Sequence, residues 1–95
     1  MPAYIVADMN VTDPAGYEEY RRLAPAAIAK YGGRYIARAG ETAILEGDWT
    51  PSRLVVIEFP SIGKAKEWYD SPEYRVARDV REGKGKFRMV VTEGL

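Results

Sequence analysis

The chain has 95 residues, 14 basic and 14 acidic side chains that give a formal net charge of zero, and neither cysteine nor histidine. This length fits one domain, residues 1–95. The lack of cysteine and histidine excludes disulfides, thiolate chemistry and catalysis by a histidine base. The balanced charge argues against nucleic-acid partners, which normally require a basic excess. No metal-ligand spacing or phosphate-binding loop is found, so we expect no metal and no cofactor.

The N-terminal segment lacks the features of a targeting signal. It carries no basic residue before its apolar stretch, and Asp8 lies inside that stretch. No apolar run approaches the length needed to cross a bilayer. We therefore expect no signal peptide, no membrane partner and a cytoplasmic location.

The first two elements are a strand and a helix. The strand is predicted over Ala3–Val11, which is mostly apolar. The pair Asp13-Pro14 then predicts a helix, because aspartate is a favourable N-cap and proline suits the first helical position. Apolar residues recur at three- and four-residue spacing until Gly32-Gly33 ends the helix. Pro25 inside it predicts a kink, since proline removes one backbone hydrogen bond.

Two strands follow the first helix. The second strand is predicted over Arg34–Ala39 and, after a bend at Gly40, continues over Thr42–Glu46. A turn over Gly47–Ser52 leads to the third strand, Arg53–Phe59, which is the most strongly apolar segment of the chain.

The last part of the chain predicts two short helices and a closing strand. Pro60-Ser61 ends the third strand and begins a helix that runs to about Tyr69. Ser71-Pro72 repeats the pattern of N-cap and first-turn proline and begins a further helix. The charged run from Arg81 to Lys86 is interpreted as a solvated helix end and turn. The closing strand is Phe87–Glu93.

This order predicts an α+β fold, βαββαβ, with a four-stranded, mostly antiparallel sheet and helices on one face. We expect the first and third strands to lie side by side, parallel, in its centre. A sheet with one solvated face should alternate apolar and polar residues. Both faces of these two strands are apolar instead, in the residues Ile5, Val6, Leu54, Val55, Val56, Ile57 and Phe59. A second copy of the chain is the simplest cover for the face without helices, so we expect a homodimer.

Several segments also resemble a known family. They are Tyr31-Gly32-Gly33-Arg34, Leu45-Glu46-Gly47-Asp48-Trp49, Glu58-Phe59-Pro60-Ser61 and Trp68-Tyr69-Asp70-Ser71-Pro72-Glu73-Tyr74. Together they resemble the family catalogued as domain of unknown function 1330, over essentially the whole chain. That family is similar to members of the dimeric α/β-barrel (ferredoxin-like) superfamily.

The resemblance implies a homodimer in which two sheets close a barrel with the helices outside. The family has no established reaction, so it supplies no catalytic residues. The wider superfamily includes cofactor-free monooxygenases, isomerases, lyases and haem-handling proteins, which is an analogy of fold alone.

Glu58 is the first candidate for chemistry, because it lies near the end of the most apolar strand. A carboxylate there should be more than half buried and needs a partner, either Arg38 or a tyrosine. Arg38 lies roughly opposite if the strands pair closely, and Asp8 on the neighbouring strand completes a candidate cluster. Glu58 and Arg38 are therefore the candidate catalytic residues, and all three are candidate ligand contacts. The alternative, which we favour, is a structural ion pair or dimer contact.

Aromatic residues are the second group of candidates. Tyr17, Tyr20, Trp68 and Tyr69 could line a ligand pocket, although aromatic residues at helical spacing are more often core. Small residues around Pro25 on the first helix leave room for a cavity of ~300 Å³ or more beside it. The alternative is that the tyrosines fill this space and the helix only follows the curvature of the sheet. Trp49 is expected to pack over the sheet end or a partner subunit.

Two functional hypotheses remain. In the first, the homodimer binds a small organic molecule between sheet and helices, and a cofactor-independent enzyme is one form of this hypothesis. In the second, the chain is a non-catalytic ligand-sensing or interaction module whose polar residues are structural. The two differ in whether Asp8, Arg38 and Glu58 converge on a cavity or pair with other groups.

Overall fold

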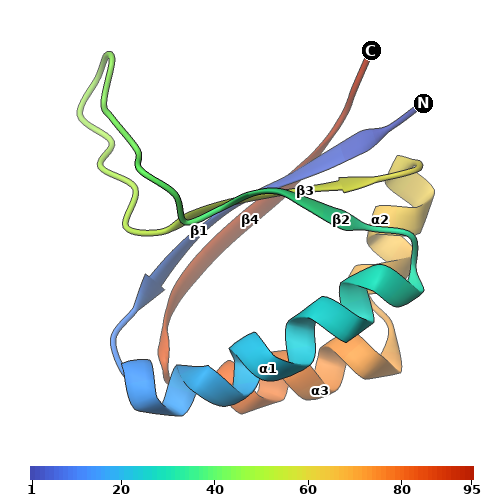
Figure 1. Ribbon diagram of the computed structural model, residues 1–95, viewed down its shortest axis with the longest axis horizontal. Coiled ribbons are helices and arrows are strands. Elements are labelled where there is room, and N and C mark those ends of the chain that lie inside the picture. The colour runs from blue at the N-terminus through green and yellow to red at the C-terminus, as the bar shows by residue number, and fades with distance from the viewer.

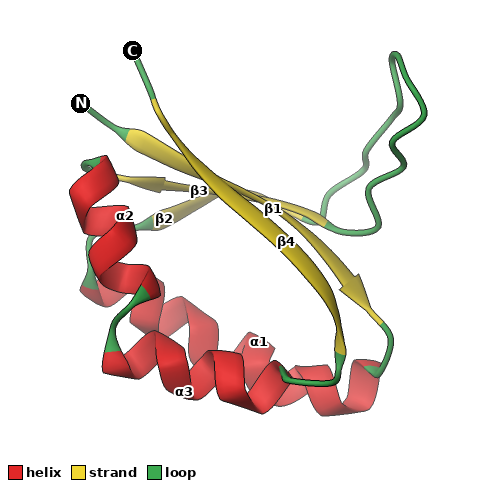
Figure 2. Cartoon of the chain, turned by 180° about the vertical axis from the view of Figure 1, so that it is seen from behind, coloured by secondary structure: helices red, strands yellow, loops and turns green.

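The computed structural model describes residues 1–95. Its strands are β1 (Ala3–Val11), β2 (Arg34–Arg38), β3 (Leu54–Phe59) and β4 (Gly85–Glu93). Its helices are α1 (Pro14–Lys30), α2 (Ile62–Tyr69) and α3 (Pro72–Arg81). The strands form one sheet in the order β2-β3-β1-β4, and all three helices lie on the same side of it (Figures 1 and 2). The expected βαββαβ order is confirmed, with two helices in the second crossover.

The central strands β1 and β3 are neighbours, but the expectation that they run parallel is wrong. Ala3 pairs with Phe59 and Asp8 with Leu54, which is an antiparallel register. The physical reason is the first crossover. Helix α1 returns the chain to the same end of the sheet, so β2 runs in the same direction as β1 and lies two strand positions away from it. Strand β3 then reverses direction and fills the gap, so it is antiparallel to both neighbours.

The second strand is also shorter than predicted. It ends at Arg38, and Ala39 follows with a positive φ of 57°, a conformation that turns the chain out of the strand. Residues 39–53 form no further strand and extend as a long loop away from the sheet, on the side opposite the helices (Figure 1). The predicted continuation over Thr42–Glu46 is therefore wrong.

The predicted helix starts are confirmed by their caps. The side chain of Asp13 accepts a hydrogen bond from the amide of Gly16 at 3.1 Å, and Ser61 and Ser71 cap α2 and α3 in the same way. Helix α1 continues through Pro25 as a single helix. It ends where Gly32 adopts a φ of 82°, since glycine enters this conformation without steric cost.

The core lies between the helices and one face of the sheet. Side chains of β1 and β3 alternate strictly, with every second residue buried beneath the helices. The opposite face of the same strands carries half-buried Val6, Leu54 and Val56, and Val90 of β4 is 64% exposed there. Both faces of the central strands are apolar, as predicted, and the helices cover only one. None of the helices combines the length and apolar character needed to cross a bilayer.

Candidate functional site

The expected cluster of Asp8, Arg38 and Glu58 does not form. Arg38 pairs with Val55 in the sheet and faces the helices, whereas Glu58 faces the open side. The guanidinium of Arg38 lies 4.4 Å above the ring of Tyr35. The expected pairing of Arg38 with Glu58 is therefore wrong, because the two side chains belong to opposite faces of the sheet.

Glu58 has two other partners. Its Oε1 accepts a hydrogen bond from Nε of Arg34 at 2.8 Å, and its Oε2 accepts one from the hydroxyl of Tyr4 at 3.0 Å. The carboxyl side chain is 24% exposed, so the expected burial and tyrosine partner are confirmed. The bonds from Arg34 and Tyr4 hold the pKa of Glu58 below its usual value. This carboxylate is thus stabilised in its charged form, which does not suit a general acid or base near neutral pH.

Asp8 holds the base of the long loop. Its carboxylate accepts hydrogen bonds from Nε1 of Trp49 at 3.2 Å and from the amides of Ser52 and Arg53 at 3.0 and 3.4 Å. Partial burial raises the pKa of Asp8, but these hydrogen bonds outweigh it and the net shift is downward. Asp8 and Glu58 lie four positions apart along the paired strands, or about 13 Å. Neither is free to act on a shared ligand.

The space between α1 and the sheet is filled. The cavity there measures about 20 Å³ and is lined in part by Tyr17, Tyr20 and Arg38. The rings of Tyr17 and Tyr20 lie 5.0 Å apart and occupy this region. Buried Ala24 and Ala27 let the helix approach the sheet instead of leaving a void. The prediction of a cavity beside Pro25 is therefore wrong. A separate hollow of about 350 Å³ does lie beside the N-terminal half of α1, where Tyr17 lines it together with residues of β1 and of the long loop.

Trp68 belongs to the core and not to a ligand pocket. Its ring is fully buried and lies 4.1 Å from the ring of Tyr74 and 5.2 Å from that of Phe59, between centroids. Its Nε1 has no hydrogen-bond partner. Tyr20 and Tyr74 adjoin this group, and burial raises the pKa of both hydroxyls, so both remain neutral. These aromatic residues therefore form part of the core, as their helical spacing favours, and do not line a ligand pocket.

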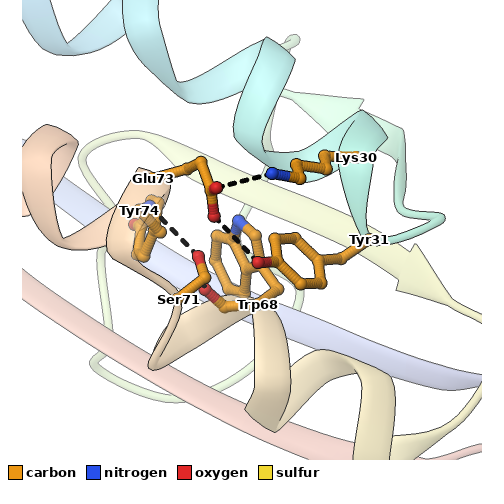
Figure 3. Close-up of polar contacts among 6 residues, drawn as sticks. All are labelled: Lys30, Tyr31, Trp68, Ser71, Glu73 and Tyr74. Atoms are coloured by element: carbon orange, nitrogen blue, oxygen red, sulfur yellow. Dashed lines mark hydrogen bonds and ion pairs between the residues drawn. The ribbon is translucent and has the colours of Figure 1, made fainter.

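A polar contact ties the end of α1 to the start of α3 (Figure 3). The carboxylate of Glu73 accepts hydrogen bonds from Nζ of Lys30 at 2.6 Å and from the hydroxyl of Tyr31 at 2.8 Å. These two bonds lower the pKa of Glu73 to about 2. The contact spans more than 40 residues of sequence and fixes where α3 begins relative to α1.

The largest mostly apolar cavity lies elsewhere, between the edge strand β4 and helices α2 and α3, which stand beside β4 in Figure 2. It measures about 390 Å³ and seven of its ten lining residues are hydrophobic. The lining residues are Ile5, Ala65, Lys66, Tyr69, Asp70, Arg81, Phe87, Met89, Val90 and Val91. Of the residues proposed as ligand contacts from the sequence, only Tyr69 lines this cavity.

Arg81 is the feature of this cavity that the sequence reasoning missed. It occupies the last turn of α3 and is only 7% exposed, so its interpretation as part of a solvated helix end is wrong. Its guanidinium carbon lies 4.4 Å from the ring centroid of Phe87 and 5.0 Å from that of Tyr20. The sequence feature that could have indicated its burial is the spacing from Tyr74. Arg81 lies seven residues after Tyr74 and therefore on the same buried stripe of the helix.

No group of three or more acidic, histidine or cysteine side chains is placed to hold a metal ion. The polar groups that could contact a ligand in the β4 cavity are Lys66, Tyr69, Asp70 and Arg81. This arrangement offers two cations, one carboxylate and one phenol around an apolar interior. It suits binding of an apolar molecule that carries a polar group.

A family model described as domain of unknown function (DUF1330) matches residues 2–95. The chain belongs to this family. The resemblance inferred from the sequence is confirmed over nearly the whole chain. No significant match to a curated protein was found.

Solved structures show the same fold as this DUF1330 chain. A protein of unknown function from Rhodopseudomonas palustris, RPA0582, has a TM-score of 0.74 and 19% identity over 99% of this chain and 82% of its own. A dimeric ferredoxin-like protein of unknown function from Jannaschia sp. CCS1 has a TM-score of 0.71 and 9% identity, covering 99% and 100%. SnoaB, a cofactor-independent oxygenase from Streptomyces nogalater, has a TM-score of 0.67 and 12% identity, covering 99% and 93%. At these identities the likeness establishes the ferredoxin-like α+β fold alone.

Proposed function

We propose that this DUF1330 protein is a homodimer that binds a small, largely apolar organic molecule in the β4 cavity, between the sheet and the helices. The observation that carries the proposal is the cavity itself. Its volume of about 390 Å³ falls in the range of small-molecule sites, which are mostly apolar with a few polar groups that orient the ligand. Tyr69 is the residue that both the sequence and the geometry favour as a ligand contact.

The open face of the sheet supports the homodimer. Val6, Leu54 and Val56 are only half-buried there although they lie on central strands. Covering each aliphatic side chain fully would contribute up to ~1.5–3 kcal/mol. A structural neighbour of similar size is described as dimeric. A second copy packed sheet to sheet would close the barrel that the superfamily resemblance implies.

The hydrogen bonds of the two acidic candidate residues, Glu58 and Asp8, favour a binding role over a catalytic one. Glu58 is bonded to Arg34 and Tyr4, and Asp8 to the long loop, so neither carboxylate is available as a base. SnoaB is described as a cofactor-independent oxygenase, and a similar role for this chain would have to use Tyr69, Asp70, Lys66 or Arg81. A ligand-binding role requires only that these groups orient a molecule.

The experiment is a fragment titration followed by NMR of the ¹⁵N-labelled protein. We expect apolar fragments to shift the amides of Ala65, Met89 and Val91 together. Replacing the partly buried Met89 with tryptophan (M89W) fills part of the cavity and should abolish these shifts. Val76→Trp is the matched control, because Val76 is 55% exposed on α3 and does not line the cavity. Fragments that bind M89W as well as the natural chain would overturn the proposal.

A further inference from the structure

Arg81 is a buried cation without an anion. No carboxylate oxygen lies within 4.0 Å of its guanidinium. Its one hydrogen bond within the chain runs from Nη1 to the sulfur of Met9, at 3.6 Å. A guanidinium carries five N–H donors, and sulfur is a weak acceptor, so most of this donor capacity is unused. The unpaired donors are not enclosed by protein, because the fully buried side-chain atoms without a hydrogen bond are Nε1 of Trp68 and Nε of Arg78. The free donors of Arg81 therefore reach the water-accessible space beside it.

The surrounding groups stabilise this cation only in part. Aromatic rings lie on several sides of it, and its position at the C-terminal turn of α3 places it near the negative end of the helix dipole. These interactions favour a positive charge but accept no directional hydrogen bond in the plane of the guanidinium. The same side chain lines the β4 cavity, so its open side faces the space proposed for a ligand.

We propose that Arg81 is the anion-binding residue of this cavity, and that the ligand is a small monocarboxylate with an aromatic or aliphatic body. This inference rests on the proposed function and names its class of ligand. A carboxylate matches the planar guanidinium with two parallel hydrogen bonds, a geometry that lysine does not offer. The apolar body would then lie against Ile5, Met89 and Val91, which line the same space.

The remaining charged groups limit the charge of the ligand. Lys66 and Asp70 both line the cavity, so its polar side chains sum to one net positive charge with Arg81 included. One negative charge on the ligand balances that sum. A second negative charge would meet the carboxylate of Asp70, which disfavours a phosphate monoester or a dicarboxylate.

The test compares an acid with its neutral isostere. Phenylacetate and phenylacetamide have the same shape and differ in charge. We expect the full-length protein to bind phenylacetate at least about tenfold more tightly than phenylacetamide by NMR titration, because hydrogen bonds to a charged group contribute that much to affinity. In Arg81→Met the preference should fall to about twofold or less, with phenylacetamide affinity little changed. Lys64→Gln is the control, because Lys64 is a cation of α2 that pairs with Glu67 and does not line the cavity, so this variant should retain the preference for the acid.

A second measurement needs no variant. The Nε–H signal of Arg81 should shift with phenylacetate and not with phenylacetamide, so the role of Arg81 can be tested even if Arg81→Met does not fold.

Two results would overturn the role of Arg81 and leave the cavity as a site for neutral molecules. One is equal affinity for the two probes at the cavity, and the other is an acid preference that survives in Arg81→Met. Failure of both probes to bind, while neutral fragments do bind, would also overturn it. Failure of every probe and fragment would overturn the proposed function as well. A carboxylate of a partner subunit seated on Arg81 would likewise block phenylacetate and count against the inference.

Discussion

The hydroxyl oxygens of Tyr20 and Tyr74 lie 2.6 Å apart inside the layer where α1 packs against α3. Both side chains are buried, and burial raises the pKa of both hydroxyls, so one neutral O–H donates and the other oxygen accepts. The guanidinium of Arg81 lies 5.0 Å from the ring centroid of Tyr20. This pair therefore couples the packing of the two long helices to the wall of the proposed ligand cavity.

The first prediction concerns this pair. Replacing either tyrosine with phenylalanine leaves the other hydroxyl buried without its partner, and each single variant should lose about 1–3 kcal/mol of unfolding free energy. The double variant should lose clearly less than the sum of the two, because both unsatisfied groups are then removed. Urea unfolding of the four proteins measures the difference. Tyr35→Phe is the control, because the hydroxyl of Tyr35 makes no hydrogen bond that the substitution could remove. If the loss of the double variant equals the sum of the two single losses, the two hydroxyls are not coupled.

The second prediction concerns pH and Glu73. Hydrogen bonds from Lys30 and Tyr31 lower its pKa to about 2 in the folded chain, from an ordinary value of 4.5. The contact therefore stabilises the fold fully above the ordinary value and is lost as the pH falls through about 2. We expect Glu73→Gln to be less stable than the natural chain at pH 6 and nearly equal to it at pH 2. Because the group is near solvent, the difference should also shrink at high salt.

Thermal unfolding of both proteins across this pH range checks the second prediction. Glu19→Gln provides the comparison, because Glu19 pairs only with Arg22 on the exposed side of α1 and such pairs contribute little. A Glu73→Gln deficit that stays constant down to pH 2 would show that the loss comes from something other than the charged carboxylate.

The fold could be predicted from sequence because its signals are local. The caps at Asp13, Ser61 and Ser71 and the alternation along β1 and β3 depend only on neighbouring residues. The partner of Glu58 could not be predicted, because it depends on the strand register. The sheet places Arg34 opposite Glu58, and an irregularity between Tyr35 and Ala37 shifts the rest of β2.

The site was harder to predict than the fold for a different reason. Arg81 shares the helical stripe of buried Tyr74 and Ala77, but a charged residue beside a glycine-rich turn is usually solvated. Its burial follows from how closely α3 packs on α1 and β4, which only the tertiary structure specifies. The alanines of α1 led to the wrong prediction of a cavity for the same reason. Small residues on a helix are compatible either with a void or with a close approach of the helix to the sheet, and the sequence does not distinguish the two.

The third prediction concerns assembly. We expect light scattering at micromolar concentration to give twice the chain mass of 10.7 kDa. Val56→Glu places a charge on the open sheet face and should produce a folded monomer, since burying an unpaired charge opposes association. Val76→Glu, on the exposed side of α3, should remain dimeric. A monomeric natural chain would contradict the barrel, and a dimeric Val56→Glu would place the interface on another surface.

The last prediction separates a structural from a functional role for Arg81 by stability alone. Replacing a buried unpaired charge with an apolar residue of similar volume removes the cost of its desolvation, whereas truncation to alanine leaves a void. We therefore expect Arg81→Met to unfold at an equal or higher urea concentration than the natural chain, and Arg81→Ala at a lower one. Adding phenylacetate should raise the unfolding midpoint of the natural chain and leave that of Arg81→Met unchanged, because only a ligand that binds the folded state stabilises it.

If Arg81→Met proves less stable by more than about 1 kcal/mol, the contacts of the guanidinium with Phe87 and Tyr20 outweigh its desolvation. In that case the residue has a structural reason for its position and needs no ligand to explain it.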